Sequence, residues 1–248
     1  MKFIRVITIS FFYVLVGCNS INLKFSDNGA EFVEPEGKII QKNIDVDMFR
    51  YLEIDLNANI ELIQSDSINI SIKGYKNIIE LIDVSVSNSK MIVKFKKSII
   101  QNNPLDIKIF VPEIQSVLIN GSGNFKINSW ENEEKLVFKN NGSSKFFLSN
   151  LKNIKHLVVE LNGGGSIEGY GECKNINALH CTLNGSGNLN FEQINTISAI
   201  IESNGSGNVE VGIAEILNAS IIGSGNISYK GFPKIHQKII GSGTIIQK

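Results

Sequence analysis

The feature that most constrains this chain is a short glycine-rich tract that recurs at a nearly fixed interval. The letters NGSGN occur at residues 120–124, 184–188 and 204–208, and related tracts begin near residues 141, 162, 222 and 240. The first glycines of the seven tracts are separated by 21, 21, 22, 20, 18 and 18 residues. Self-similarity at a period near 20 residues is typical of a solenoid in which each repeat forms one coil. Residues 114–248 are therefore predicted to form seven GSG-containing coils.

The residues around each tract support a solenoid, because equivalent positions carry similar side chains. The column four residues before the first glycine is apolar in six coils: Val117, Phe138, Val159, Cys181, Ile201 and Ala219. The column one residue later is mostly polar, and the column four residues after the glycine is apolar again. Alternation of this kind predicts a half-buried strand on each side of the turn. The chain is thus predicted to be all-β, a parallel β-helix (solenoid) of roughly 20-residue coils.

The glycines of the tracts are predicted to be structural, since stacked turns need positive φ angles or a backbone without a Cβ in the way. These turn glycines are Gly121, Gly123, Gly142, Gly163, Gly185, Gly187, Gly205, Gly207, Gly223, Gly225, Gly241 and Gly243. Two asparagine columns, one starting at Asn120 and one at Asn124, are predicted to form side-chain amide ladders. A phosphate loop would need a helix and a lysine after the glycines, and a calcium β-roll would need an aspartate in every turn. Neither is present, so no metal and no cofactor are expected.

The residues that precede the repeat divide into three parts. Residues 1–17 begin with two cations and continue with an apolar stretch of 11 residues, Val6 to Val16, which is too short to span a bilayer and is typical of an export signal. Residues 18–45 mix polar residues without clear periodicity and are predicted to form a tether. Residues 46–248 are predicted to form the β-helix domain, with less regular strands over 46–113, where apolar residues alternate.

The end of the apolar stretch, Leu15-Val16-Gly17-Cys18, resembles the lipobox of bacterial lipoproteins. In that motif the cysteine is acylated, for example with palmitate, and becomes the first residue of the mature protein. The resemblance implies that residues 1–17 are a lipoprotein signal peptide and that Cys18 is the lipid-attachment site. The alternative is an ordinary signal peptide in which Cys18 is incidental. We therefore expect an exported protein, lipid-anchored to a bacterial cell membrane, with the outer membrane favoured.

Several stretches together resemble a known family. The repeated GSG corners, the stretch MFRYLEIDLNANIELIQSDSINISIKG and the stretch PLDIKIFVPEIQSVLINGSGNFKI are similar to the auto-transporter adhesin head domain family, a domain of unknown function. The resemblance covers roughly residues 40–248. It implies a right-handed parallel β-helix and an extracytoplasmic location, and it brings no catalytic residues.

The outward-facing residues offer few candidates for chemistry. Glu160 and Glu202 share one outward column two coils apart, with a separation near the upper end of that used by inverting glycosidases. A charged outward column is also what any solvated solenoid shows, so the protein is not expected to be an enzyme. Cys181 belongs to an inward column and is expected to be a small buried hydrophobe, while a bridge from Cys173 to Cys181 stays an open alternative.

One outward column is unexpectedly apolar. Five residues before the glycine stand Val137, Val158, His180 and Ile200, a candidate partner face that the chain itself or a second copy would cover. The chain has 24 basic and 24 acidic side chains, so its formal net charge is zero and gives no reason to expect binding to nucleic acid. The sequence thus favours a lipid-anchored, adhesin-like binding protein that presents its solenoid surface to a glycan or a protein. The alternatives are a purely structural cell-envelope module and, less favoured, a polysaccharide-degrading enzyme.

Overall fold

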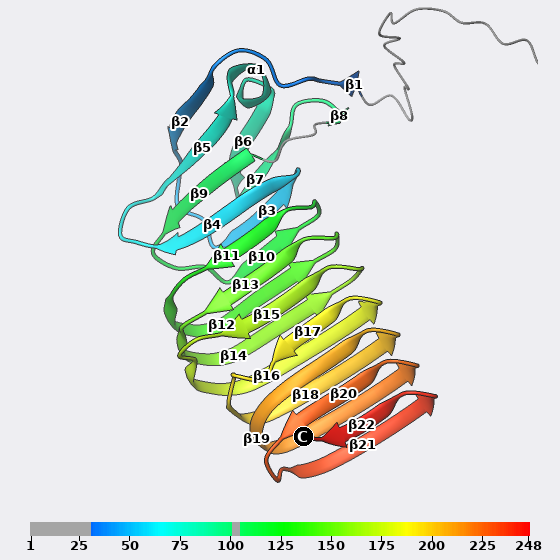
Figure 1. Cartoon of the computed structure of the whole chain (residues 1–248). Coiled ribbons are helices and arrows are strands. Elements are labelled where there is room, and N and C mark those ends of the chain that lie inside the picture. The colour runs from blue at the N-terminus through cyan, green and yellow to red at the C-terminus, as the bar shows by residue number, and fades with distance from the viewer. Residues whose placement is uncertain (1–30, 101–104) are drawn as a thin grey trace, which may run out of the picture.

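The computed structural model describes residues 31–100 and 105–248, which form a parallel β-solenoid of about six turns (Figure 1). Strands account for 69% of the residues and helix for 2%, which confirms the predicted fold class. The signal peptide, Cys18 and the first part of the predicted tether lie outside the described residues. Within them, no helix combines the length and the apolar character needed to cross a membrane.

Each coil of the repeat consists of two strands joined by a glycine corner. We call sheet 1 the sheet of strands that lead into the corners, and sheet 2 the sheet of strands that leave them. In the repeat, sheet 1 contains β10 (Ser116–Ile119), β12 (Trp130–Asn140), β14 (Leu151–Leu161), β16 (Lys174–Gly185), β18 (Thr196–Gly205) and β21 (Lys234–Gly241). Sheet 2 contains β11 (Asn124–Ile127), β13 (Lys145–Ser149), β15 (Ser166–Tyr170), β17 (Asn188–Phe191), β20 (Asn226–Lys230) and β22 (Thr244–Gln247). The long strand β19 (Asn208–Gly223) contributes to both sheets.

The register of the repeat places the predicted columns one above another. Val117 pairs with Phe138, Phe138 with Val159, and so on through the coils, in parallel and without slippage at this position. From Val117 to Ala219 these side chains are buried between the two sheets, whereas Gln237, the last member of the column, is exposed. Phe125, Phe138 and Phe146 form an aromatic cluster, with ring centroids 4.8 to 6.4 Å apart. The apolar columns therefore form one continuous core along the solenoid axis.

The corners stack so closely that a side chain would not fit at the glycines. At Gly205, φ is +149°, and a Cβ would lie 2.2 Å from the carbonyl oxygen of Gly185 in the preceding coil. That distance is far below van der Waals contact. Absence of a Cβ is therefore the common requirement at the corners, and positive φ is an additional one at some of them.

The predicted asparagine ladders are present at these corners. In the first ladder Nδ2 of each asparagine donates to Oδ1 of the asparagine one coil earlier, at 2.7 to 3.0 Å, from Asn204 back to Asn120. The second ladder is interrupted, because Lys145 and Ser166 occupy its column between Asn124 and Asn188. A third ladder, not predicted from the sequence, joins Asn132, Asn153 and Asn175 on the return path at 2.7 to 3.0 Å. Its three asparagines all have positive φ angles, a conformation that asparagine tolerates better than most residues.

The N-terminal region contains one coil that has no glycine corner. Strands β3 (Tyr51–Asp55) and β4 (Ala58–Gln64) pair in parallel with β10 and β11, in the same register as the coils of the repeat. The chain then leaves the solenoid path through β5 (Asn69–Tyr75), α1 (Lys76–Ile79), β6 (Ile82–Ser87), β7 (Lys90–Phe95), β8 (Ile99–Ile100) and β9 (Leu105–Val111). These elements surround the upper end of the solenoid in Figure 1.

Antiparallel strands extend both sheets at this end. In sheet 2 the order is β2 (Ile39–Asp45), β5, β9, β4, β11, with β2 and β5 antiparallel to their neighbours. In sheet 1 the order is β6, β7, β3, β10, with β6 antiparallel to β7. The short strand β1 (Glu31–Phe32) pairs with β8. The segment predicted as a tether thus includes strand β2, where Ile40 and Ile44 pack against the core.

Candidate binding surface

The candidate partner face predicted from the sequence is one continuous column on the outer side of sheet 1. Val137 pairs with Val158, Val158 with His180, and His180 with Ile200, whose side chain is 40% exposed. The column forms one side of an open hollow of about 390 Å³ that Ala178 and Ser198 also line. The described residues leave this apolar strip open to solvent.

The two glutamates considered for catalysis lie in one outward column, with Thr182 between them. Glu160 Oε2 forms an ion pair with Lys139 Nζ at 2.8 Å. Glu202 Oε2 lies 3.4 Å from His180 Nε2 and 3.4 Å from Thr182 Oγ1. Each carboxylate is therefore engaged separately in a solvated row of polar side chains. Among the described residues, no group of three His, Cys, Asp or Glu side chains is placed to hold a metal ion.

The two cysteines of the domain are free and buried. Cys181 is fully enclosed between the sheets, and burial raises the pKa of its thiol strongly. Burial also raises the pKa of the Cys173 thiol. Since the thiolate is the reactive form, both thiols are poorly reactive at neutral pH. The open alternative of a bridge between them is not what this structure contains.

A second hollow, which sequence reasoning did not find, lies on the outer side of sheet 2 and is called here the sheet 2 groove. It has a volume of about 640 Å³ and crosses β2, β5, β9, β4, β11, β13 and β15. Its apolar floor includes the buried residues Ile60 and Ile107. The remaining lining residues are Gln41, Asn59, Glu61, Ser71, Lys73, Asp106, Lys108, Asn124, Lys126, Phe147 and Tyr170.

Strand pairing arranges these side chains in two rows across the sheet. One row runs along the corner side of the strands: Gln41, Lys73, Asp106, Asn59 and Asn124. The other row lies on the same strands, two residues away from the first and farther from the corners: Ser71, Lys108, Glu61, Lys126 and Phe147. Because alternate residues of a strand point to the same face, both rows project outward over the same strands. In Figure 1, β2 and β5 stand more steeply than the coils below, so this part of sheet 2 is twisted relative to the repeat.

Both carboxylates of the groove already have partners. Glu61 Oε2 lies 3.1 Å from Lys108 Nζ, and its Oε1 accepts a hydrogen bond of 2.8 Å from Asn128. Asp106 Oδ1 accepts a hydrogen bond of 3.2 Å from Asn59. Lys73 and Lys126 are exposed, and among the described residues neither has an ion-pair or hydrogen-bond partner. The groove therefore presents two ammonium groups without an ion-pair partner and one carboxylate, that of Asp106, whose partner is a neutral amide.

Two aromatic side chains form the end of the groove nearest the repeat. Phe147 is half-buried in a column whose other members in the repeat are mostly polar, and Tyr170 is 36% exposed on the neighbouring strand β15. An aromatic ring on an outward position of a solenoid has no role in the core. Phe147 was thus a signal in the sequence that could have indicated this surface.

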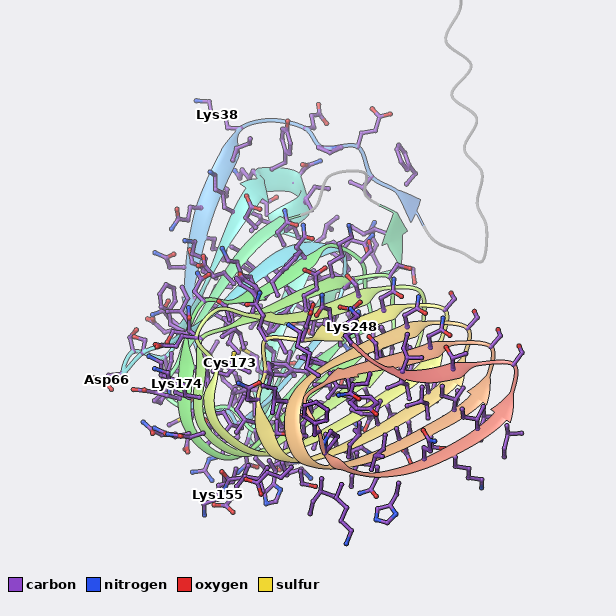
Figure 2. All side chains as sticks on the ribbon, turned by 60° about the horizontal axis from the view of Figure 1, so that its bottom comes forward. Lys38, Asp66, Lys155, Cys173, Lys174 and Lys248 are labelled. Atoms are coloured by element: carbon purple, nitrogen blue, oxygen red, sulfur yellow. The ribbon has the colours of Figure 1, made fainter. Side chains whose placement is uncertain are left out.

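Another hollow of similar volume, about 630 Å³, lies on the outer side of sheet 1 over β3, β6, β7, β10 and β12, but its two lysines, Lys90 and Lys139, each pair with a glutamate. Elsewhere, Lys155 and Lys174 project away from the coils in Figure 2, and each pairs with a glutamate. The sheet 2 groove differs because it combines two aromatic side chains with two lysines that have no ion-pair partner among the described residues. It is the best candidate for a ligand site among the described residues.

Comparisons with solved structures find the same fold in bacterial proteins. An adhesin-like protein of Bacteroides fragilis, described as a "putative adhesin", matches with a TM-score of 0.77 and 26% identity over 87% of this chain and 100% of that chain. A "putative lipid binding protein" of Parabacteroides distasonis matches with a TM-score of 0.69 and 20% identity over 88% of this chain and 100% of that one. A "putative adhesin" of Parabacteroides merdae matches with a TM-score of 0.64 and 22% identity over the same shares, 88% and 100%.

The search of curated proteins found no match. The scan against family models found one for residues 48–233, described as "Putative auto-transporter adhesin, head GIN domain". This agrees with the resemblance found in the GSG corners and in the stretches that precede them, and neither the family nor the structural relatives are named as enzymes. The match covers most of the chain, and the chain therefore belongs to the auto-transporter adhesin head GIN domain family.

Proposed function

We propose that this protein is an exported, lipid-anchored binding protein, adhesin-like in role, that captures a glycan in the sheet 2 groove. The groove itself is the observation that carries the proposal. It joins an apolar floor and two aromatic side chains to amide and charged groups, which is the usual composition of a ligand site. Membership of an adhesin-named family supports an extracellular or surface-exposed role.

The lining suits a sugar better than a lipid. One face of a sugar ring carries C–H groups with partial positive charge, which pack favourably on the negative face of an aromatic ring such as Phe147. Its hydroxyl groups can then exchange hydrogen bonds with amides such as Asn59 and Asn124. A lipid tail would need an enclosed apolar cavity, whereas this groove is open and has polar rows along its length. We therefore do not extend the lipid-binding name of the Parabacteroides distasonis protein to this chain.

A glycan array probed with the intact protein in mild detergent tests the proposal. Phe147→Ser should weaken binding to any captured glycan about tenfold or more, because it removes the stacking surface. Ile246→Ser is the matched control, since Ile246 is exposed in the same outward column at the far end of sheet 2. Loss of binding in both variants, or in neither, would contradict a site at the groove. A folded protein that binds no glycan would leave the structural cell-envelope module as the better hypothesis.

The anchor is a separate part of the proposal. If Cys18 is acylated, Cys18→Ser should move the protein from the membrane pellet to the soluble fraction and abolish incorporation of labelled palmitate. A lipid anchor supplies the membrane affinity, so the effect should be nearly complete in the absence of another membrane-binding segment. Unchanged fractionation and unchanged labelling would show that Cys18 is incidental and that the signal is an ordinary one.

A further inference from the structure

We infer that the ligand of the sheet 2 groove is an acidic polysaccharide that crosses the strands from Phe147 toward β5 and places its anionic groups on Lys126 and Lys73. This inference rests on the proposed function and deepens it, because it names the class of glycan. Four observations carry it: the pairing of the charges, the position of Lys126 beside Phe147, the distance to Lys73, and the charge beyond Phe147.

The pairing of the charged side chains in the groove indicates the sign of the ligand's charge. Glu61 is paired with Lys108, whereas Asp106 accepts a hydrogen bond only from the neutral amide of Asn59 and lies opposite Lys73. The lining has three lysines against these two carboxylates, so its net charge is +1. Lys73 and Lys126 have no ion-pair partner among the described residues. A ligand that enters the groove therefore meets free donors with positive charge. Charge-assisted hydrogen bonds to carboxylate or sulfate groups are stronger than those to neutral hydroxyls, so an anionic ligand gains most.

The position of Lys126 links this charge to the sugar. Lys126 and Phe147 are direct neighbours on β11 and β13, about 4.8 Å apart along the sheet. A sugar ring stacked on Phe147 would thus have its substituents within reach of the Lys126 ammonium group. The lysine and the aromatic ring can act on one acidic sugar unit together.

The distance to Lys73 indicates a polymer. Lys73 lies on β5, and β9 and β4 separate β5 from β11, so three strand spacings of about 4.8 Å put the two lysines about 14 Å apart across the sheet. One small anion cannot contact both. A chain with an anionic group on successive units can, and its backbone would follow the two polar rows between them.

The charge beyond Phe147 sets the direction of the chain. The next residue in that row is Glu168 on β15, which is exposed and does not line the groove. An acidic polymer that continued across β15 would meet a like charge at this point. The favourable direction from Phe147 is therefore toward β11 and β5, over the two lysines.

The test compares three polymers on the intact protein by a binding titration. Polygalacturonate carries a carboxylate on every sugar, fully methyl-esterified polygalacturonate has the same sugars without the charge, and poly-L-glutamate has the charge without sugars. The variant K73Q/K126Q removes the two unpaired cations. The matched control K234Q/K238Q removes two exposed lysines on β21, at the far end of sheet 1, and changes the net charge equally.

We expect the parent to bind polygalacturonate at least tenfold more tightly than either other polymer. K73Q/K126Q should lower that affinity about tenfold and reduce its dependence on salt, whereas K234Q/K238Q should leave both unchanged. If the esterified polymer binds as tightly as polygalacturonate and Phe147→Ser still weakens binding, the ligand is a glycan but not an acidic one. The inference then fails, while the proposed function stands. Poly-L-glutamate binding as tight as that of polygalacturonate would overturn the choice of a glycan. If the array finds no glycan for the folded parent, the proposed function fails together with this inference.

Discussion

The N-terminal region, residues 31–113, and the repeat, residues 114–248, build the same two sheets by different means. The repeat uses one coil again and again, with parallel strands and a glycine corner in each. The N-terminal region uses parallel and antiparallel strands and a short helix, and its one regular coil turns through Leu56 and Ala58, which are buried. Despite this, β3 and β4 pair with the repeat in full register.

The contrast shows what the glycines are for. A corner that lies on an equivalent corner must leave space for the carbonyl oxygen one coil earlier, as Gly121 does above Leu56 and Gly123 above Ala58. The corner of β3 and β4 does not lie on such a turn, since a longer connection of nine residues separates β7 from β9, the strands on its other side. Glycine is therefore required where one corner stacks on another, and the turn itself can form without it.

The two regions also divide the tasks of structure and binding. In the repeat, each outward column stacks similar side chains from coil to coil. Such a column forms a ridge more readily than a hollow. The sheet 2 groove forms where repetition ends, because β2, β5 and β9 bring unrelated side chains next to β4 and β11. A regular solenoid and an irregular end thus combine a rigid support with a specific surface.

The largest expected effect comes from a methyl group at a stacked corner. Gly205→Ala places a Cβ 2.2 Å from the Gly185 carbonyl oxygen at a φ of +149°, so we expect a loss of about 2–4 kcal/mol in unfolding free energy. Gly37→Ala is the control in the N-terminal region, since φ there is +87° but nothing lies within 4 Å of an added Cβ. It should cost about 1 kcal/mol. Denaturant titration measures both, and equal costs would show that φ alone, and not stacking, requires the glycines.

A smaller effect is expected on the candidate partner face. Val158→Lys puts a charge in the apolar strip of Val137, Val158 and Ile200, and should lower either the oligomeric mass or the melting temperature by a few degrees. Ser116→Lys is the matched control, because Ser116 occupies the same outward column next to the N-terminal region. Light scattering and thermal unfolding give the two readouts. If neither changes in Val158→Lys, this strip has no covering partner.

The sequence was sufficient for whatever depends on repetition. A fixed spacing predicted the corners, the inward columns such as that of Val159, and the ladder from Asn120 to Asn204, because each coil experiences the same environment as the next. The third ladder was also visible as Asn132, Asn153 and Asn175 at intervals of 21 and 22 residues. It is harder to recognise than the first ladder, because the return path varies in length from coil to coil.

The groove could not be predicted in the same way. Its neighbours are set by the pairing of β5 with β2 and β9, and no periodicity indicates which antiparallel strands will lie side by side. The pairing of Glu61 with Lys108 and the free state of Lys126 depend on that order of strands. Phe147 and Tyr170 are the groove residues whose position in a repeat column carried information, as outward aromatic side chains.

The amide groups of the first asparagine ladder also form a row of aligned dipoles. Every amide in it donates toward the N-terminal end, so its dipoles are aligned along the axis, as peptide dipoles are in a helix. Its positive end meets a carboxylate, because Asn120 Nδ2 donates to Glu53 Oε1 at 3.4 Å. An acidic group thus stands at the positive end of this row, as acidic groups do at helix N-termini. The row of exposed amides therefore has a defined polarity, with its donor end at the start of the repeat and its acceptor end at Asn204.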